Sequence, residues 1–166
     1  MNTYIFLYPE TSFFEVNLVA YFMKTKGNVS IVTERDNKAI YTNEGIKILS
    51  DIFIDEIRIE DIDVFAVCGG EIKNIKNKPL LYQTIKSCAA NDKIIGGICA
   101  GRDIVKNALD LNNDSETTYV TDKIILSPGN EYVDFALEIG KAADIFGDED
   151  DYNETINYFK LFKSVE

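Results

Sequence analysis

Residues 93–105, KIIGGICAGRDIV, pass from an apolar run to a helix-like pattern through a few small residues. At the junction lies Gly97-Ile98-Cys99-Ala100-Gly101, a G-x-C-x-G sequence. A nucleophile elbow has this pattern at a strand-to-helix turn, usually with serine as the central residue. Small neighbours are needed because the sharp turn holds the nucleophile in strained backbone angles. The stretch therefore predicts a strand, a turn that presents Cys99, and a helix.

Strands and helices alternate on both sides of this stretch. Apolar runs predict strands at 4–8, 28–33, 63–70 and 93–99. Helical patterns cover 12–27, ending at Gly27, then 78–92, 100–111 and 131–147, ending at Gly147. A hairpin is predicted at 117–129, turning at Asp122 and Lys123, and 35–62 is read as loop with short edge strands at 39–42 and 45–48. Such alternation predicts an α/β fold with an open, mostly parallel sheet between layers of helices.

The pattern predicts one main domain, residues 1–147. The remaining residues, 148–166, are read as an acidic linker, DEDD, and a C-terminal helix at 153–164 that packs on the same domain. A chain of 166 residues is long enough for one such domain with a substantial core.

Composition restricts the possible partners. The formal net charge of -11 repels polyanions, so we expect no nucleic-acid partner. No apolar run reaches about eighteen residues, and MNTYIFLYPE lacks the features of a signal peptide. We therefore expect no membrane partner and a cytoplasmic location.

The three cysteines carry different expectations. They lack a CxxC spacing and the chain has no histidine, so we expect no disulfide framework, no metal and no cofactor. Cys68 and Cys88 are read as core residues. Cys99 is either another small core residue or a reactive thiol. The flanking glycines favour the reactive interpretation, and the positive end of the following helix is expected to favour the thiolate.

Glu15 also allows two interpretations. Ser12-Phe13-Phe14-Glu15 fits a capping box, in which the glutamate only marks a helix start. Glu15 also shares a helical stripe with Val19 and Phe22, and a carboxylate on a buried face needs a partner or a proton.

Gly69 and Gly70 end a predicted central strand, at the sheet edge where ligands bind in such folds. Their N–H groups could stabilise an oxyanion, or the pair could form only a tight turn. Arg102, in the first turn of the elbow helix, is either a contact for an anionic substrate group or an exposed arginine.

The chain resembles the ThiJ/PfpI superfamily, which includes the Parkinsonism-associated deglycase. The resemblance covers residues 3 to 147 and lies in FLYPETSFFEV, GIKILSD, DVFAVCGGE, GGICAG and ILSPGNEYVDFALEI. It implies a flavodoxin-like three-layer sandwich related to class I glutamine amidotransferases. It also implies a homodimer.

The resemblance further implies that Cys99 is the nucleophile and that a protonated Glu15 lies against its sulfur. Gly70 and Ala100, with Gly69 beside them, would supply an oxyanion or anion site. A thiolate and a carboxylate in contact share a proton and titrate as a pair.

Two departures from the superfamily pattern matter. The segment from Arg102 to Ser127 is short and lacks the loop that commonly brings a histidine to the cysteine, so protease activity is not expected. Cys68 stands where the superfamily motif has a proline.

Three functions remain open. The first is an enzyme in which Cys99 adds to a small electrophile, of glyoxalase, deglycase or hydratase type, with Glu15 as proton shuttle. The second is a redox-responsive protein in which an oxidant converts Cys99 to a sulfinate. The third is a dimeric binding module with a vestigial pocket.

Overall fold

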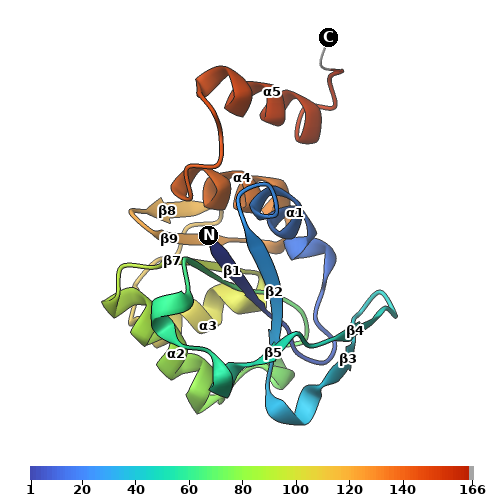
Figure 1. Cartoon of the computed structure of the whole chain (residues 1–166), viewed down its shortest axis with the longest axis vertical. Coiled ribbons are helices and arrows are strands. Elements are labelled where there is room, and N and C mark those ends of the chain that lie inside the picture. Colours follow the sequence, from blue (N-terminus) through green and yellow to red (C-terminus); the bar gives the residue numbers. More distant parts are fainter. Residues whose placement is uncertain (165–166) are drawn as a thin grey trace.

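The computed structural model describes residues 1–164 and has an α/β fold. Within these residues, seven strands form one sheet in the order β5-β2-β1-β6-β7-β9-β8 (Figure 1). The parallel strands are β1 (Asn2–Phe6), β2 (Asn28–Thr33), β5 (Ile52–Phe53), β6 (Val64–Val67), β7 (Ile94–Ile98) and β9 (Ile124–Ser127). β8 (Tyr119–Thr121) is antiparallel to β9, and β3 (Ala39–Tyr41) pairs with β4 (Lys47–Leu49) in a separate hairpin. The predicted fold class is confirmed.

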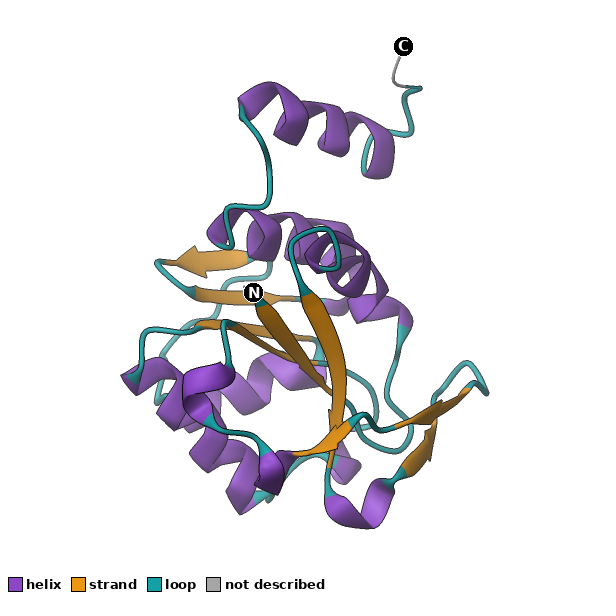
Figure 2. Cartoon of the chain, viewed as in Figure 1, coloured by secondary structure: helices purple, strands orange, loops and turns teal. Residues whose placement is uncertain are grey.

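Helices cover both faces of this sheet (Figure 2). α1 (Phe14–Met23) and α4 (Tyr132–Ala142) cover one face, and α2 (Pro79–Ala90) and α3 (Ala100–Ala108) cover the other. A further helix, α5 (Glu149–Phe159), lies farther from the sheet. Short 3-10 turns lie at Arg35–Asn37, Ile54–Glu56, Ile59–Asp61, Ile72–Asn74 and Gly129–Glu131. None of the helices in residues 1–164 is long and apolar enough to cross a membrane.

The alternation of side chains along the central strands creates two cores. In β6, Val64 and Ala66 pack with α1 and α4, whereas Phe65 and Val67 pack with α2 and α3. All four are fully buried, as expected for a parallel strand that is covered on both faces. The sheet is therefore the middle layer of a three-layer sandwich.

Several predicted helix ends were wrong. α1 ends at Met23 and not at Gly27, and α4 ends at Ala142 and not at Gly147. Asp144 adopts a left-handed backbone with φ 52°, its N–H bonds Lys141 O, and the N–H of Ile145 bonds Gly140 O. These two bonds form a Schellman motif, which stops α4 before the glycine is reached.

The acidic residues 148–151 start a helix, although the sequence suggested a linker. The Asp148 side chain accepts the Asp151 N–H at 2.9 Å, and Glu149, Asp150 and Asp151 occupy the first turn. Acidic residues are favourable there because the N-terminal end of a helix is positive. α5 therefore begins at Glu149, four residues before the predicted start.

α5 lies outside the layer formed by α1 and α4 (Figure 2) and contacts it through aromatic rings. The ring centroids of Phe159 and Phe22 are 5.1 Å apart, and those of Tyr152 and Phe146 are 5.0 Å apart. Residues 165–166 of the predicted C-terminal segment lie outside the described residues.

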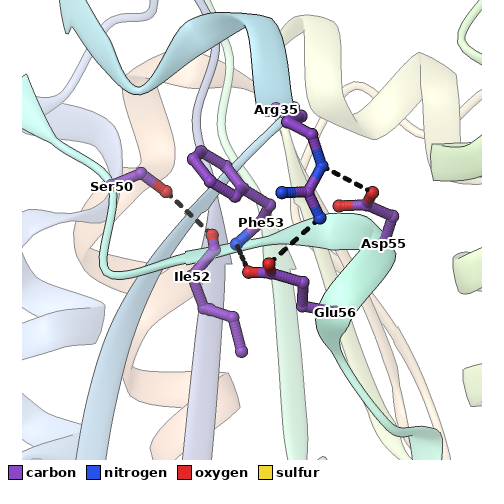
Figure 3. A network of polar contacts seen from close by, with 6 residues as sticks. All are labelled: Arg35, Ser50, Ile52, Phe53, Asp55 and Glu56. Atoms are coloured by element: carbon purple, nitrogen blue, oxygen red, sulfur yellow. Dashed lines mark hydrogen bonds and ion pairs between the residues drawn. The ribbon is translucent and has the colours of Figure 1, made fainter.

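Polar contacts secure the edge of the sheet at β5 (Figure 3). The Arg35 guanidinium donates to Asp55 at 2.9 Å and to Glu56 at 3.0 Å, and it lies 5.0 Å from the centroid of the Phe53 ring. Glu56 also accepts the Phe53 N–H at 3.3 Å. One arginine after β2 thus holds the short neighbouring strand.

The register brings four chain segments together at one end of the sheet. Phe6 aligns with Val67, Val67 with Gly97, and Gly97 with Leu126. Two residues beyond each of these lie Tyr8, Gly69, Cys99 and Pro128, all past the ends of their strands. The candidate site lies at these carboxyl ends.

Candidate functional site

Cys99 has the strained backbone expected of a nucleophile elbow. Cys99 lies between the end of β7 and the start of α3 and has a φ of 52° and a ψ of -120°. Such a conformation costs about 1–3 kcal/mol in a residue other than glycine. Its N–H donates to Ser127 O at 3.0 Å, and the side chain is exposed. The elbow thus presents the thiol to solvent at the end of the central strand.

Glu15 and Cys99 lie beside each other between two glycines. A methyl group at Gly69 would overlap Glu15 Oε2 and lie 2.5 Å from Cys99 Cβ. A methyl group at Gly129 would lie 2.8 Å from Glu15 Oε1 and 3.4 Å from Cys99 Sγ. Both positions therefore need glycine for the carboxyl group and the thiol to meet. The sequence reasoning did not identify Gly129, although Pro128-Gly129 directly after a strand was a usable signal.

The capping-box interpretation of Glu15 was wrong. The N-cap of α1 is Phe13, whose own side chain makes no capping hydrogen bond. The Glu44 carboxylate, on the β3–β4 hairpin, instead accepts the Phe14 N–H at 3.0 Å. The pKa of Glu44 is lowered because bonds from Thr42 and from the start of α1 outweigh its burial. Glu15 is therefore left to face the elbow.

The environment of Glu15 keeps a large share of its carboxyl groups protonated near neutral pH. The residue is 4% exposed, and in the described part of the chain its Oε2 has no donor in regular hydrogen-bond geometry. Burial raises its pKa from 4.5 to about 7, while the Cys99 thiol and the nearby Gly69 N–H act in the opposite direction. Glu15 can therefore both give and accept a proton near neutral pH.

The expected preference for a thiolate at Cys99 was wrong. Although Cys99 is exposed as a residue, its thiol is half-buried, and this desolvation raises the pKa of the thiol above its ordinary value of 9.0. The negative charge of Glu15 raises the pKa further. The nearby N–H groups of Ala100 and Gly70 lower its pKa, but by less. The helix end and the N–H groups thus lower the pKa of Cys99 by less than desolvation raises it. Since the two groups interact, they titrate as a pair.

The three residues proposed for anion binding have different contacts. The N–H groups of Gly70 and Ala100 are the ones that lower the pKa of the Cys99 thiol. Gly70 has a φ of 131°, which favours glycine. The N–H of Gly69 lowers the pKa of Glu15, and the Gly69 carbonyl accepts the Thr11 hydroxyl at 2.8 Å. Gly70 and Ala100 are therefore the candidate donors to the sulfur.

The Arg102 guanidinium bonds protein rather than lying free for a ligand. Its Nη2 donates to the carbonyl of Ser115, in the segment before β8. The structure therefore brings Cys99, Glu15 and the three backbone donors together, and directs the Arg102 side chain to this neighbouring segment.

Tyr8 is a further residue near the site that sequence reasoning missed. It is 1% exposed, and its hydroxyl has no hydrogen-bond partner within residues 1–164. Burial raises its pKa, as do the negative charges that Cys68, Glu15 and Cys99 can carry. Its position just after β1, in line with Gly69 and Cys99, was the available signal.

The other two cysteines are buried. Cys68 bonds Ser12 O at 3.3 Å, and burial raises its pKa far above the ordinary range of a thiol. Burial raises the pKa of Cys88 to about 12. Across residues 1–164, no group of three or more Cys, Asp or Glu side chains is placed to hold a metal ion.

Several solved structures with the same fold are DJ-1 superfamily proteins. A DJ-1 superfamily protein from Agrobacterium tumefaciens has a TM-score of 0.85 and 19% identity, over 98% of this chain and 100% of that chain. Drosophila melanogaster DJ-1beta has a TM-score of 0.75 and 19% identity, over 99% and 98%. Schizosaccharomyces pombe DJ-1 has a TM-score of 0.76 and 17% identity, over 96% and 99%. At these identities the similarity supports the fold alone.

No curated protein is similar enough in sequence to count as a match. A profile of the DJ-1/PfpI family, however, matches residues 1–143. This range includes the whole sheet, helices α1 to α4 and every residue of the candidate site. The chain therefore belongs to the DJ-1/PfpI family.

Proposed function

We propose that the protein is an enzyme in which Cys99 adds to an electrophilic carbon of a small molecule, with Glu15 as the proton carrier. The observation that carries this proposal is the buried Glu15 carboxyl, whose pKa is raised to about 7, beside an exposed thiol at a strained elbow. A general acid–base works best when its pKa lies near the operating pH.

The first step is addition to a carbonyl compound such as an α-oxoaldehyde. The sulfur forms a bond to the carbonyl carbon while the thiol proton passes to the Glu15 carboxylate. The same proton then passes to the carbonyl oxygen, which gives a hemithioacetal. The N–H groups of Gly70 and Ala100 stabilise negative charge on the sulfur during the transfer. No poor leaving group departs, so one carboxyl suffices, and peptide hydrolysis is not proposed for a chain without histidine.

Turnover of methylglyoxal by the wild type and by Cys99→Ser tests this proposal. We expect consumption by the wild type and none above the buffer rate with Cys99→Ser, because the serine hydroxyl is a far weaker nucleophile. Cys88→Ser is the matched control, since Cys88 is buried in α2, and it should keep the wild-type rate. Equal consumption by the wild type and Cys99→Ser would sink the proposal.

A redox-responsive role is the second candidate. Its support is that two N–H donors and a protonatable carboxyl surround an exposed sulfur, an arrangement that suits a sulfinate. Treatment with hydrogen peroxide and peptide mass mapping should then show two added oxygen atoms on Cys99, without turnover of methylglyoxal. An unmodified Cys99 would count against this role.

We also propose a homodimer. Apolar side chains are exposed on the β3–β4 hairpin and the adjoining start of α1, namely Phe14, Tyr41, Ile46 and Leu49. Exposed apolar groups of this kind are typical of protein contacts. Light scattering at micromolar concentration should give twice the chain mass, and a monomer mass would contradict the proposal.

A cytoplasmic location forms part of the same proposal. Its support is that all three cysteines, which lie in the described part of the chain, are free thiols. Free thiols are usual in reducing compartments.

A further inference from the structure

A chain of hydrogen bonds connects Glu131 to the backbone of the elbow. Glu131 Oε2 accepts the Thr118 N–H at 2.6 Å and the Thr118 hydroxyl at 2.7 Å. The hydroxyl oxygens of Thr118 and Ser127 are 2.9 Å apart. The carbonyl of Ser127 accepts the Cys99 N–H at 3.0 Å. The side chains of Glu131, Thr118 and Ser127 are thus connected, and the carbonyl of Ser127 bonds the backbone of Cys99.

The hydrogen atoms in this chain can point in one direction only. The two bonds from Thr118 lower the pKa of Glu131, so its carboxylate is ionised at neutral pH and can only accept. The Thr118 hydroxyl must therefore donate to Glu131, which leaves its lone pairs to accept from Ser127. A chain with fixed donors and acceptors holds its members in one orientation.

Ser127 joins this chain to both reacting groups. The residue is fully buried at the end of β9, and its carbonyl bonds the Cys99 N–H. Two residues further on, Gly129 contacts the Glu15 carboxyl and the Cys99 side chain. A rotation of Ser127 would therefore move the elbow and the wall beside Glu15 together.

Arg102 fixes the same segment from the elbow helix. Its guanidinium bonds Ser115 O, and Ser115 Oγ lies 3.0 Å from the carbonyl of Thr117. The positive charge of Arg102 also contributes to the lowered pKa of Glu131. The residues that lead into β8 are thus tied to α3 on one side and to the start of α4 on the other.

We infer that Thr118 and Glu131 are positioning residues for Cys99, acting through Ser127. They hold the sulfur against the N–H groups of Gly70 and Ala100 and beside the Glu15 carboxyl. This role rests on the proposed reactivity of Cys99, and neither side chain enters the reaction itself.

The test compares Thr118→Val with Thr118→Ser. Valine keeps the shape but loses the hydroxyl, whereas serine keeps the hydroxyl. The readout is the rate of Cys99 alkylation by iodoacetamide from pH 6 to 11, with peptide mapping and a urea unfolding curve for each variant. We expect Cys99 in Thr118→Val to react about tenfold more slowly at pH 8, and the midpoint of its alkylation pH profile to rise. A tenfold change is at the upper end of what the loss of one hydrogen bond produces. Thr118→Ser should follow the wild type.

Superimposable alkylation profiles for wild type, Thr118→Val and Thr118→Ser would overturn the inference. So would a loss of stability in Thr118→Val without any change in the pH profile, because that result describes a purely structural residue. If Thr118→Val does not fold, Ser127→Ala takes its place, since it removes only the middle hydroxyl. Alkylation needs no turnover, so the inference can fail or hold independently of methylglyoxal consumption.

Discussion

Tyr8 buries a hydroxyl that lacks a partner within residues 1–164. A buried polar group without a hydrogen bond costs about 1–3 kcal/mol. We therefore expect Tyr8→Phe to leave the free energy of unfolding in urea unchanged or to raise it by up to that amount. Tyr82→Phe, on the partly exposed face of α2, is the control and should have no effect. A clear loss of stability in Tyr8→Phe would show that the hydroxyl has a partner, such as an ordered water.

At this residue scale, local sequence patterns were enough to propose part of the candidate site. Cys99, Gly70 and Ala100 could be identified as candidates from the sequence, because a G-x-C-x-G turn and a strand-ending glycine pair restrict the backbone locally. Gly129 and Tyr8 were missed because their roles depend on which strands are neighbours in the sheet. The pKa of Cys99 was predicted in the wrong direction because sequence reveals a helix end but not the burial that opposes it.

Among the elements, α1 has a cap that comes from a distant part of the chain. Glu44 accepts the Phe14 N–H from 30 residues away. We expect Glu44→Ala to lower the free energy of unfolding by about 1 kcal/mol, the usual value of a lost cap, and Glu44→Gln to restore most of it. Ser12→Ala, which tests the capping box, should cost less, because Ser12 does not cap the helix. A larger loss for Ser12→Ala than for Glu44→Ala, measured by urea unfolding, would reverse this assignment.

Strands were easier to predict than helix ends for a physical reason. Residues 28–33 and the turn at Asp122 were predicted correctly because a buried strand and a tight turn each have a local pattern. α4 stops at Ala142 because Asp144 takes up a left-handed backbone, an option that glycine usually fills. Whether the helix stops at Asp144 or at Gly147 depends on the packing of Ile145 in the core, which the sequence pattern does not reveal.

For the whole molecule, the buried Glu15 makes stability depend on pH. Its pKa is 4.5 when unfolded and about 7 when folded, so the folded protein binds more protons between these values. The stabilisation is complete below pH 4.5 and is lost as the pH rises through 7. A pKa difference of this size changes the free energy of unfolding by at most about 3 kcal/mol.

Glu15→Gln should remove this dependence. Urea unfolding at pH 5 and pH 8 should show that the wild type loses more stability than Glu15→Gln over this range. Asp63→Asn, which changes a carboxylate outside the site, is the control for the loss of one acidic group. Parallel losses in wild type and Glu15→Gln would mean that the carboxyl of Glu15 titrates normally.

The overall architecture was the most predictable level, because alternating strands and helices with short connections leave few arrangements other than a parallel sheet between helices. The acidic residues 148–151 were the exception, since net charge suggested a linker and only the Asp148 cap reveals a helix start.

The central claim is that Glu15 and Cys99 form one coupled proton-sharing pair, and the pH dependence of Cys99 alkylation tests it most directly. The wild type should show a midpoint above the ordinary 9.0 of a thiol and a change in rate near pH 7, where Glu15 ionises. In Glu15→Gln the change near pH 7 should vanish and the midpoint should fall, because the neighbouring negative charge is gone. Superimposable profiles for the two proteins would contradict the claim.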